Sequence, residues 1–284
     1  MTAAAPGRPR EPRPGTWFRR RIDIRSSLRE IWGARELVRS LAERDLRARY
    51  KQAFLGVAWA VVTPLVLMAV FTVVFDRVTK VDTQGVPYPL FAYVGLVPWT
   101  FFSSSVSTAG VSLVANTSLL NKIYCPREVF PLAAVIVAGV DTALSLFALV
   151  PLFVITGHGP TAQSVWVPLL FAIQLCFTLG VTLAVSSILV YLRDLRHALP
   201  IILQFGLFAT PVAYGIGTIA ESSRILFAAV NPLAPVIEGY RETVLYGRPP
   251  EWATTVAGSV TAIVVLAGGY VLFKRLETGI ADVA

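Results

Sequence analysis

Residues 116–132 read NTSLLNKIYCPREVFPL and separate two long apolar runs with a polar stretch. The segment holds one lysine, one arginine and one glutamate, and it opens with Asn116 and Thr117, residue types that cap helix N-termini. We predict a short amphipathic helix over residues 116–128, between two membrane-spanning helices. Because so short a helix buries little surface alone, a contact with another protein is favoured over an ordinary cytosolic loop.

The apolar side chains of this segment would seat in a cleft of the partner, with Arg127 and Glu128 as charges at the rim of the contact. The residues assigned to the contact are Asn116, Leu119, Leu120, Lys122, Ile123, Tyr124, Arg127 and Glu128. A second polar loop, residues 191–196, is shorter and more charged, and it is the weaker candidate for a seated helix.

The composition predicts an all-α integral membrane protein. Hydrophobic residues make up 55% of the 284 positions and charged residues 15%, against about 25% in soluble domains. The apolar runs are continuous rather than alternating, which argues against a barrel, and several reach the roughly 20 residues that cross a bilayer as a helix. Six spans are predicted, at about residues 53–75, 89–115, 129–156, 165–190, 198–216 and 252–273.

The positive charges predict an orientation and argue against nucleic acid as a partner. Of the 25 Lys and Arg residues, 14 lie within residues 1–52, and most others flank apolar runs instead of forming a phosphate-binding surface. With the N-terminus in the cytosol, 20 of the 25 lie on the cytosolic side and 5 outside. We therefore expect a multi-pass protein with both termini in the cytosol.

Three regions are predicted along the chain. Residues 1–25, rich in Pro and Arg, read as a disordered cytosolic tail, residues 26–51 as an amphipathic interface helix, and residues 52–284 as the transmembrane domain. The interface helix would lie in the membrane surface with its basic face toward lipid headgroups, and a solvated cytosolic helix is the alternative. Cys125 lies in the polar segment and Cys176 in an apolar run, so we expect neither a disulfide nor a metal site.

Residues 217–250 fit neither a simple loop nor a span. Their apolar part, residues 225–237, is too short to cross a bilayer and is interrupted by Asn231, Pro232 and Pro235. We predict two short helices that dip into the outer leaflet and cover the outer side of a path, because non-helical backbone at that depth must be enclosed in protein or face water.

Enzyme signatures are absent from the sequence. The patterns GxSxG, HExxH and GxxxxGK[ST] do not occur, and the two histidines, His158 and His197, fall on opposite sides of the membrane. A membrane-embedded transferase with an unrecognised site is the enzyme alternative. Asp141 is the one acid deep in a predicted span, and we favour a structural hydrogen bond over a proton relay because no relay partner is visible.

Aromatic residues gather around the outer end of the first two predicted spans. An interfacial belt explains Tyr88 and Trp99 well, whereas a path on which the C–H faces of sugar rings pack is the functional alternative. The residues concerned are Phe71, Phe75, Tyr88, Phe91, Tyr93, Trp99, Phe101 and Phe102.

Short motifs spread along the chain add a resemblance. They are RDLRARY at 44–50, LGVAW at 55–59, GLVPW at 95–99, PRE at 126–128, YLRD at 191–194, TPVAY at 210–214 and NPL at 231–233. In this order and on a frame of six spans, from residue 37 to residue 275, the chain resembles the permease subunits of polysaccharide ABC exporters. These type-2 ABC transporters move O-antigen, teichoic acid and galactan chains.

The resemblance implies a homodimer around a continuous channel, with two copies of a cytosolic ATP-binding subunit below it. ATP and Mg would bind the partner, and no cofactor would bind this chain. Residues 116–128 would be the coupling helix. Relative to the family, the chain departs at Asn121, where a basic residue is common, and at Cys125, where an aromatic residue is expected.

Three further groups of residues receive roles. Tyr214 joins the eight aromatics as a residue of the glycan path. The placement of positive charge on the basic face of the interface helix suggests that Arg47, Arg49 and Lys51 would attract a diphosphate before it enters the path. The outer gate would include Asn231, Pro232, Glu238, Tyr240 and Arg241.

The expected function is therefore the transmembrane permease half of an ATP-driven exporter in a bacterial inner membrane. Its cargo would be a polysaccharide linked to polyprenyl diphosphate, such as galactan or O-antigen. An ABC permease for a small amphiphile or drug is the alternative, and a receptor or scaffold without transport is a third reading.

Overall fold

The computed structural model describes residues 24–51, 56–79, 81–120 and 125–283, and these residues form helices and connecting turns without any strand. Most of the helices are assigned as α. They are α1 (Ile24–Gly33), α2 (Arg35–Tyr50), α3 (Trp59–Phe71), α4 (Tyr88–Ala115), α5 (Thr117–Leu120), α6 (Val129–Leu146), α7 (Leu149–Thr156), α8 (Val167–Tyr191), α9 (Leu195–Ala209), α10 (Glu221–Val230), α11 (Leu233–Val244) and α12 (Trp252–Val283). Short 3-10 or π turns are η1 (Gly56–Ala58), η2 (Thr72–Thr79), η3 (Ala162–Trp166) and η4 (Ile216–Thr218).

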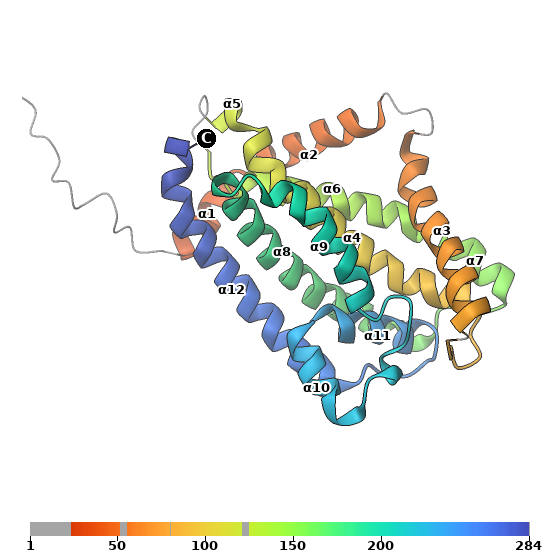
Figure 1. Ribbon diagram of the computed structural model, residues 1–284. Helices are drawn as coiled ribbons and strands as arrows, with labels where there is room; N and C mark the ends of the chain where they lie inside the picture. The colour runs from red at the N-terminus through yellow and green to blue at the C-terminus, as the bar shows by residue number, and fades with distance from the viewer. Residues whose placement is uncertain (1–23, 52–55, 80, 121–124, 284) are drawn as a thin grey trace, which may run out of the picture.

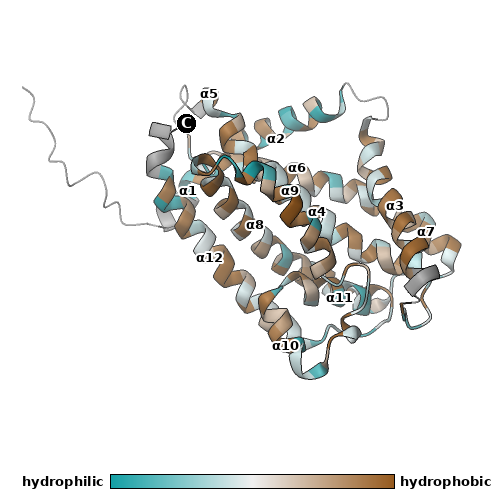
Figure 2. Cartoon of the chain, in the orientation of Figure 1, coloured by the Kyte–Doolittle hydropathy of each residue, from teal (hydrophilic) through white to brown (hydrophobic). Residues whose placement is uncertain are grey.

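Five helical segments of the described chain are long and apolar enough to cross a membrane. They are Gly56–Phe75, Tyr88–Ala115, Val129–Thr156, Ala162–Tyr191 and Trp252–Glu277. Figure 2 shows that hydrophobic residues predominate in these segments and in α9, with hydrophilic residues near some of their ends. The all-α membrane architecture predicted from the sequence is thus confirmed, and these five segments overlap five of the six predicted spans.

The fifth predicted span, residues 198–216, is the one that differs. Its helix, α9, has 15 residues and ends at Ala209, after which Thr210 is extended. Pro211 explains the end of this helix, because the residue before a proline is disfavoured in helical conformation. The chain then turns through residues 210–215 before reaching α10.

Helix α4 lies at the centre of the helix bundle (Figure 1). Within its most apolar window 78% of the residues are buried, compared with 11% for the segment that contains α3. α4 packs against α3, α6 and α8, and α8 in turn packs along α12. Because lipid offers no hydrophobic driving force between helices, close backbone packing of this kind stabilises the bundle.

The predicted interface helix is two helices rather than one. The helical conformation is interrupted at Ala34, which follows Gly33, a poor helix former, and separates α1 from α2. The apolar face of α2 is buried through Val38, Leu41 and Ala42 in a cluster that includes Phe130 of α6. The basic residues of α2 lie on its exposed side. The apolar face of this amphipathic helix is therefore covered by other helices of the same chain.

The bundle has two distinct ends (Figure 1). Helices α2 and α5 and the last turns of α12 lie at one end, and α10 and α11 lie at the other. The prediction of two short helices between the last two spans is confirmed by α10 and α11, which have 10 and 12 residues.

Candidate functional site

The coupling segment, residues 116–128, begins with side chains that bond backward to α4. The Asn116 side-chain amide donates to the Ser112 carbonyl at 2.8 Å, and the Thr117 hydroxyl donates to the Val114 carbonyl at 2.8 Å. The expectation that Asn116 and Thr117 cap the next helix is therefore wrong. Asn116 is instead the C-cap residue of α4, and its side-chain oxygen accepts a hydrogen bond from Arg44 of α2 at 2.9 Å.

Only part of the predicted contact with a partner protein can be placed. Lys122, Ile123 and Tyr124 lie outside the described residues, and of Leu120 only the backbone, at the end of α5, is described. Leu119 is partly buried and packs against the cluster shared by α2, α4 and α6. The role of this segment in binding a partner stays a prediction.

Arg127 and Glu128 connect the coupling segment to the end of α12. The Glu128 carboxylate is 1% exposed and forms an ion pair with Lys274, which also bonds Glu277 at 2.9 Å. Arg127 donates a hydrogen bond to the Glu277 carbonyl. The prediction that Glu128 is a charge at the rim of a contact is wrong, because its side chain is enclosed by this chain.

The C-terminal end of α2 is fixed to the third span through Asp141. The Arg49 guanidinium forms an ion pair with one oxygen of this carboxylate, and the Tyr50 hydroxyl donates to the other. Burial, together with the hydrogen bond to Asp141, raises the pKa of Tyr50 to about 12. Asp141 thus has the structural bonding role that the sequence favoured, with its partners on the interface helix.

The three basic residues predicted to attract a diphosphate differ in their surroundings. Arg47 and Lys51 are exposed, and the nearest carboxylate oxygen to Arg47 is that of Glu43 at 3.9 Å. The positive charge of Arg49 is instead compensated by Asp141. Of the predicted trio, Arg47 and Lys51 are thus the two that present charge to the surroundings.

The predicted aromatic path is largely the core of the chain. Seven of its nine residues are no more than 8% exposed, and their rings pack against other side chains of the same chain. These seven are Phe71, Tyr88, Phe91, Tyr93, Trp99, Phe101 and Phe102. These seven rings are enclosed by other side chains of this chain, and their role in a glycan path stays a prediction. Phe75 and Tyr214 are partly exposed and stay predicted path residues.

The end of the bundle that holds α10 and α11 is organised around the buried side chain of Arg241. Its guanidinium donates to the carbonyls of Pro211 at 2.8 Å, Val212 at 2.5 Å and Tyr214 at 3.0 Å. It also lies 3.7 Å from the ring centroid of Phe91 on α4. Burial lowers the pKa of Arg241, and the neighbouring carboxylate of Glu238 opposes this effect.

The other predicted gate residues tie the same region together. The Asn231 amide donates to the Thr210 hydroxyl at 2.9 Å, and the Tyr240 hydroxyl donates to the Gln174 side chain at 3.1 Å. The Glu238 carboxylate bonds Arg241 at 3.3 Å, and Pro232 directly precedes α11. The five residues therefore lie together at one end, while a gating movement of this region stays a prediction.

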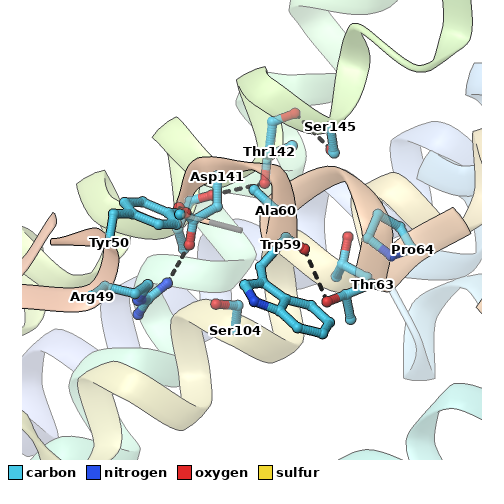
Figure 3. A pocket seen from close by; sticks show the side chains of 13 residues that line it. Arg49, Tyr50, Trp59, Ala60, Thr63, Pro64, Ser104, Asp141, Thr142 and Ser145 are labelled. Atoms are coloured by element: carbon cyan, nitrogen blue, oxygen red, sulfur yellow. Dashed lines mark hydrogen bonds and ion pairs between the residues drawn. The ribbon is translucent and has the colours of Figure 1, made fainter. Parts of the chain in front are cut away.

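Two residues of these sites, Lys274 and Trp59, have no site role predicted from the sequence. Lys274 directly follows the sixth predicted span and counts there only among the 20 Lys and Arg residues expected on the cytosolic side. Trp59, at the start of α3, is 50% exposed and faces a cavity next to Asp141 (Figure 3). Its position in the LGVAW motif was noted only as part of the resemblance.

Comparisons with known proteins agree with this architecture. The model of the ABC-2 type transporter family matches residues 36–245. An O-antigen export system permease protein RfbA of Myxococcus xanthus is 34% identical over 257 residues, which cover 90% of this chain and 98% of that protein. An RfbA of Klebsiella pneumoniae is 28% identical over 87% of this chain and 95% of its own length.

A more distant relative points the same way. The polysialic acid transport protein KpsM of Escherichia coli is 23% identical over 84% of this chain and 93% of its own length. The family match covers well over half of the chain and spans the helices from α2 to α11. This chain belongs to the ABC-2 type transporter family.

Proposed function

We propose that this chain is the transmembrane permease of an ATP-driven exporter that moves a lipid-linked polysaccharide out of the cytosol. The observation that carries this proposal is the similarity to an O-antigen export permease along 90% of this chain and 98% of that protein. Because the similarity includes the interface helix, the coupling segment and the outer helices, it favours polysaccharide over a small amphiphile as cargo.

The energy for transport would come from a separate ATP-binding subunit. The sequence has no GxxxxGK[ST] motif with which to hold the phosphates of ATP. Residues 116–128 are the proposed docking segment for that subunit, and their bonds to α2 and α12 would carry its movement into the bundle. Two copies of this chain and two ATP-binding subunits form the proposed complex, since a closed two-fold pair turns a groove into a pore.

The proposed orientation places α2, α5 and the end of α12 on the cytosolic side of the bacterial inner membrane, with six passes in total. The asymmetry of Lys and Arg supports this orientation. The passes are the five long helices and α9, which is short but could extend across the membrane together with the turn at residues 210–215. Arg47 and Lys51 would then meet the diphosphate of the lipid carrier on the cytosolic side.

Depletion of the protein in its own host tests the proposed cargo. We expect a lipid-linked polymer to accumulate inside the cells and its surface form to disappear, with recovery when the gene is restored. A control strain that keeps the permease but carries an ATP-binding subunit that cannot hydrolyse ATP should accumulate the same polymer. Normal surface glycan, together with loss of ATP-dependent dye uptake into inverted vesicles, would instead support the small-amphiphile alternative and contradict the proposal.

A further inference from the structure

A cavity of about 350 Å³ lies between the end of α2 and helices α3, α4 and α6. Its volume falls within the range of about 300–1,000 Å³ that is typical of small-molecule sites. Figure 3 shows Arg49, Tyr50 and Asp141 along one side and Trp59 and Thr63 along the other. Neither the family match nor the predicted glycan path assigns a role to this cavity.

The hydroxyl groups around the cavity are prepared to accept hydrogen bonds. Thr63 donates its hydroxyl hydrogen to the Trp59 carbonyl at 2.9 Å, and Thr100 donates to the Val97 carbonyl at 2.8 Å. Thr142 and Ser145 likewise donate within their own helix, at 2.8 and 2.7 Å. Because each hydroxyl has one hydrogen and two lone pairs, these groups keep acceptor sites for a ligand.

Asp141 strengthens this acceptor character. Its carboxylate receives one hydrogen bond from Arg49 and one from Tyr50, and a carboxylate has about four acceptor sites in all. Its negative charge is compensated by Arg49. A bound phosphate would therefore meet a carboxylate and several acceptor oxygens without an uncompensated cation, which disfavours an anionic ligand.

Trp59 adds an apolar wall. Its side chain is 50% exposed and lines the cavity on the side opposite Asp141 (Figure 3). An indole ring offers a large flat face at low conformational cost. A fitting ligand thus carries several O–H donors around its edge and a C–H face that can lie on the indole, and these are the properties of a pyranose ring.

We propose that this cavity is a binding subsite for a single sugar ring of the transported glycan. The proposal rests on the proposed function and adds to it the place where a neutral part of the cargo is held. In the proposed orientation the cavity lies at the cytosolic side of α3, next to the exposed charges of Arg47 and Lys51. The lipid diphosphate and the sugar next to it would then be recognised by neighbouring but separate groups.

Saturation-transfer NMR on the purified complex of permease and ATP-binding subunit tests this subsite. The probes are four methyl hexopyranosides, the glucoside, galactoside, mannoside and rhamnoside, each at millimolar concentration. We expect transfer to the ring protons of at least one glycoside, and no displacement by inorganic pyrophosphate. Trp59→Leu should weaken binding at least about tenfold, which corresponds to the loss of roughly one favourable contact.

Two further variants separate binding from folding. Thr63→Val keeps the side-chain shape and leaves the ion pair of Arg49 with Asp141 intact, and it should weaken binding several-fold. Trp32→Leu, at a residue 72% exposed on α1, is the matched control and should bind as the parent protein does. Absence of transfer for all four glycosides, unchanged binding in both Trp59→Leu and Thr63→Val, or displacement by pyrophosphate would overturn the proposal.

Failure of the subsite and failure of the proposed function give different results. If the complex exports lipid-linked glycan with ATP but binds none of the glycosides, the subsite is excluded while the exporter remains. If glycosides bind but no glycan is exported, the proposed function fails and the subsite stands as a sugar-binding cavity.

Discussion

The Arg241 guanidinium donates hydrogen bonds to backbone carbonyls of a turn, which have no donor within a helix. After α9 ends at Ala209, the carbonyls of Pro211, Val212 and Tyr214 have lost the intrahelical donors that would normally pair with them. Arg241 reaches all three from α11 while its own side chain is fully buried. One residue therefore fixes the turn after α9 to α11 and, through Phe91, to α4.

Replacing Arg241 should destabilise the protein strongly. In Arg241→Met three carbonyls lose their donor, and each buried group without a partner costs about 1–3 kcal/mol. We expect the thermal unfolding midpoint of the purified protein in detergent to fall by roughly 5–10 °C in Arg241→Met. The midpoint of Arg241→Lys should fall less, because the ammonium group keeps the positive charge. Arg248→Met, at an exposed position, is the control. An unchanged midpoint for Arg241→Met would show that the turn is held by other contacts.

Glu242 predicts a dependence of stability on pH. Burial raises the pKa of this carboxyl from 4.5 to about 7, and the Glu251 backbone N–H, which donates to it at 2.9 Å, offsets this only in part. Glu238 and Glu251 raise the value further, and Arg248 lowers it. Because the folded protein prefers the protonated form, this group contributes stability in full below pH 4.5 and loses that contribution as the pH rises toward 7.

Glu242→Gln should remove this dependence. As the pH rises from about 5 to about 7.5, we expect the thermal unfolding midpoint of the parent protein to fall relative to that of Glu242→Gln. The glutamine keeps a carbonyl oxygen that can accept the hydrogen bond from the Glu251 N–H. Glu221→Gln, at an exposed position on α10, should follow the parent curve. Parallel curves for the parent and Glu242→Gln would contradict the assignment.

At the scale of elements, the contact between α8 and α12 depends on two glycines. A Cβ atom at Gly180 would lie 2.6 Å from the Val265 carbonyl oxygen, and one at Gly269 would overlap the carbonyl of Gly180. In membrane helices such small residues allow the backbones to approach closely. The neighbouring Gly268 has no atom within 4 Å of the same test position, so the requirement is specific to one face of α12.

Alanine at either contact glycine should push the two helices apart. We expect Gly180→Ala and Gly269→Ala each to destabilise the purified protein by about 1–3 kcal/mol, the usual cost of overpacking. Gly268→Ala should be neutral or slightly stabilising, since alanine is the better helix former. Thermal unfolding in detergent measures all three, and equal effects at Gly268 and Gly269 would exclude the close contact.

The coupling segment and α12 are linked by a buried ion pair whose two members are not equivalent. Lys274→Met leaves the Glu128 carboxylate buried without its cation, which costs about 3–5 kcal/mol. Glu128→Gln leaves Lys274 with Glu277 and should cost less. We expect the double variant to be more stable than Lys274→Met alone in thermal unfolding, because no unpaired charge remains. A double variant less stable than Lys274→Met would contradict the pairing.

For the molecule as a whole, the lengths of the apolar runs are sufficient to predict the all-helical membrane architecture, while the orientation that the charge asymmetry predicts stays a prediction. Lipid requires long apolar helices, so five spans could be located within a few residues. The fifth predicted span runs past Pro211, although the restriction that a proline places on Thr210 favours an end of the helix there. The prolines that interrupt residues 225–237 predict the two short helices that the structure has as α10 and α11.

The side chains at the candidate sites were harder to predict. Core and lipid-facing positions of a spanning helix are both apolar, so hydropathy could not show that Tyr93 and Phe101 are enclosed while Trp59 is exposed. The pairing of Glu128 with Lys274 joins positions 146 residues apart, and no local periodicity reports such a contact. The sequence predicts a structural hydrogen bond for Asp141, but only the folded structure shows that its partners lie on α2.

The central claim is that this chain forms the passage while a separate ATP-binding subunit drives transport. The most direct measurement is translocation of lipid-linked polysaccharide into sealed vesicles that contain the permease alone, the permease with its ATP-binding subunit, or the permease with a hydrolysis-deficient subunit. We expect ATP-dependent accumulation only in vesicles with the active subunit. Accumulation against a gradient by the permease alone would contradict it.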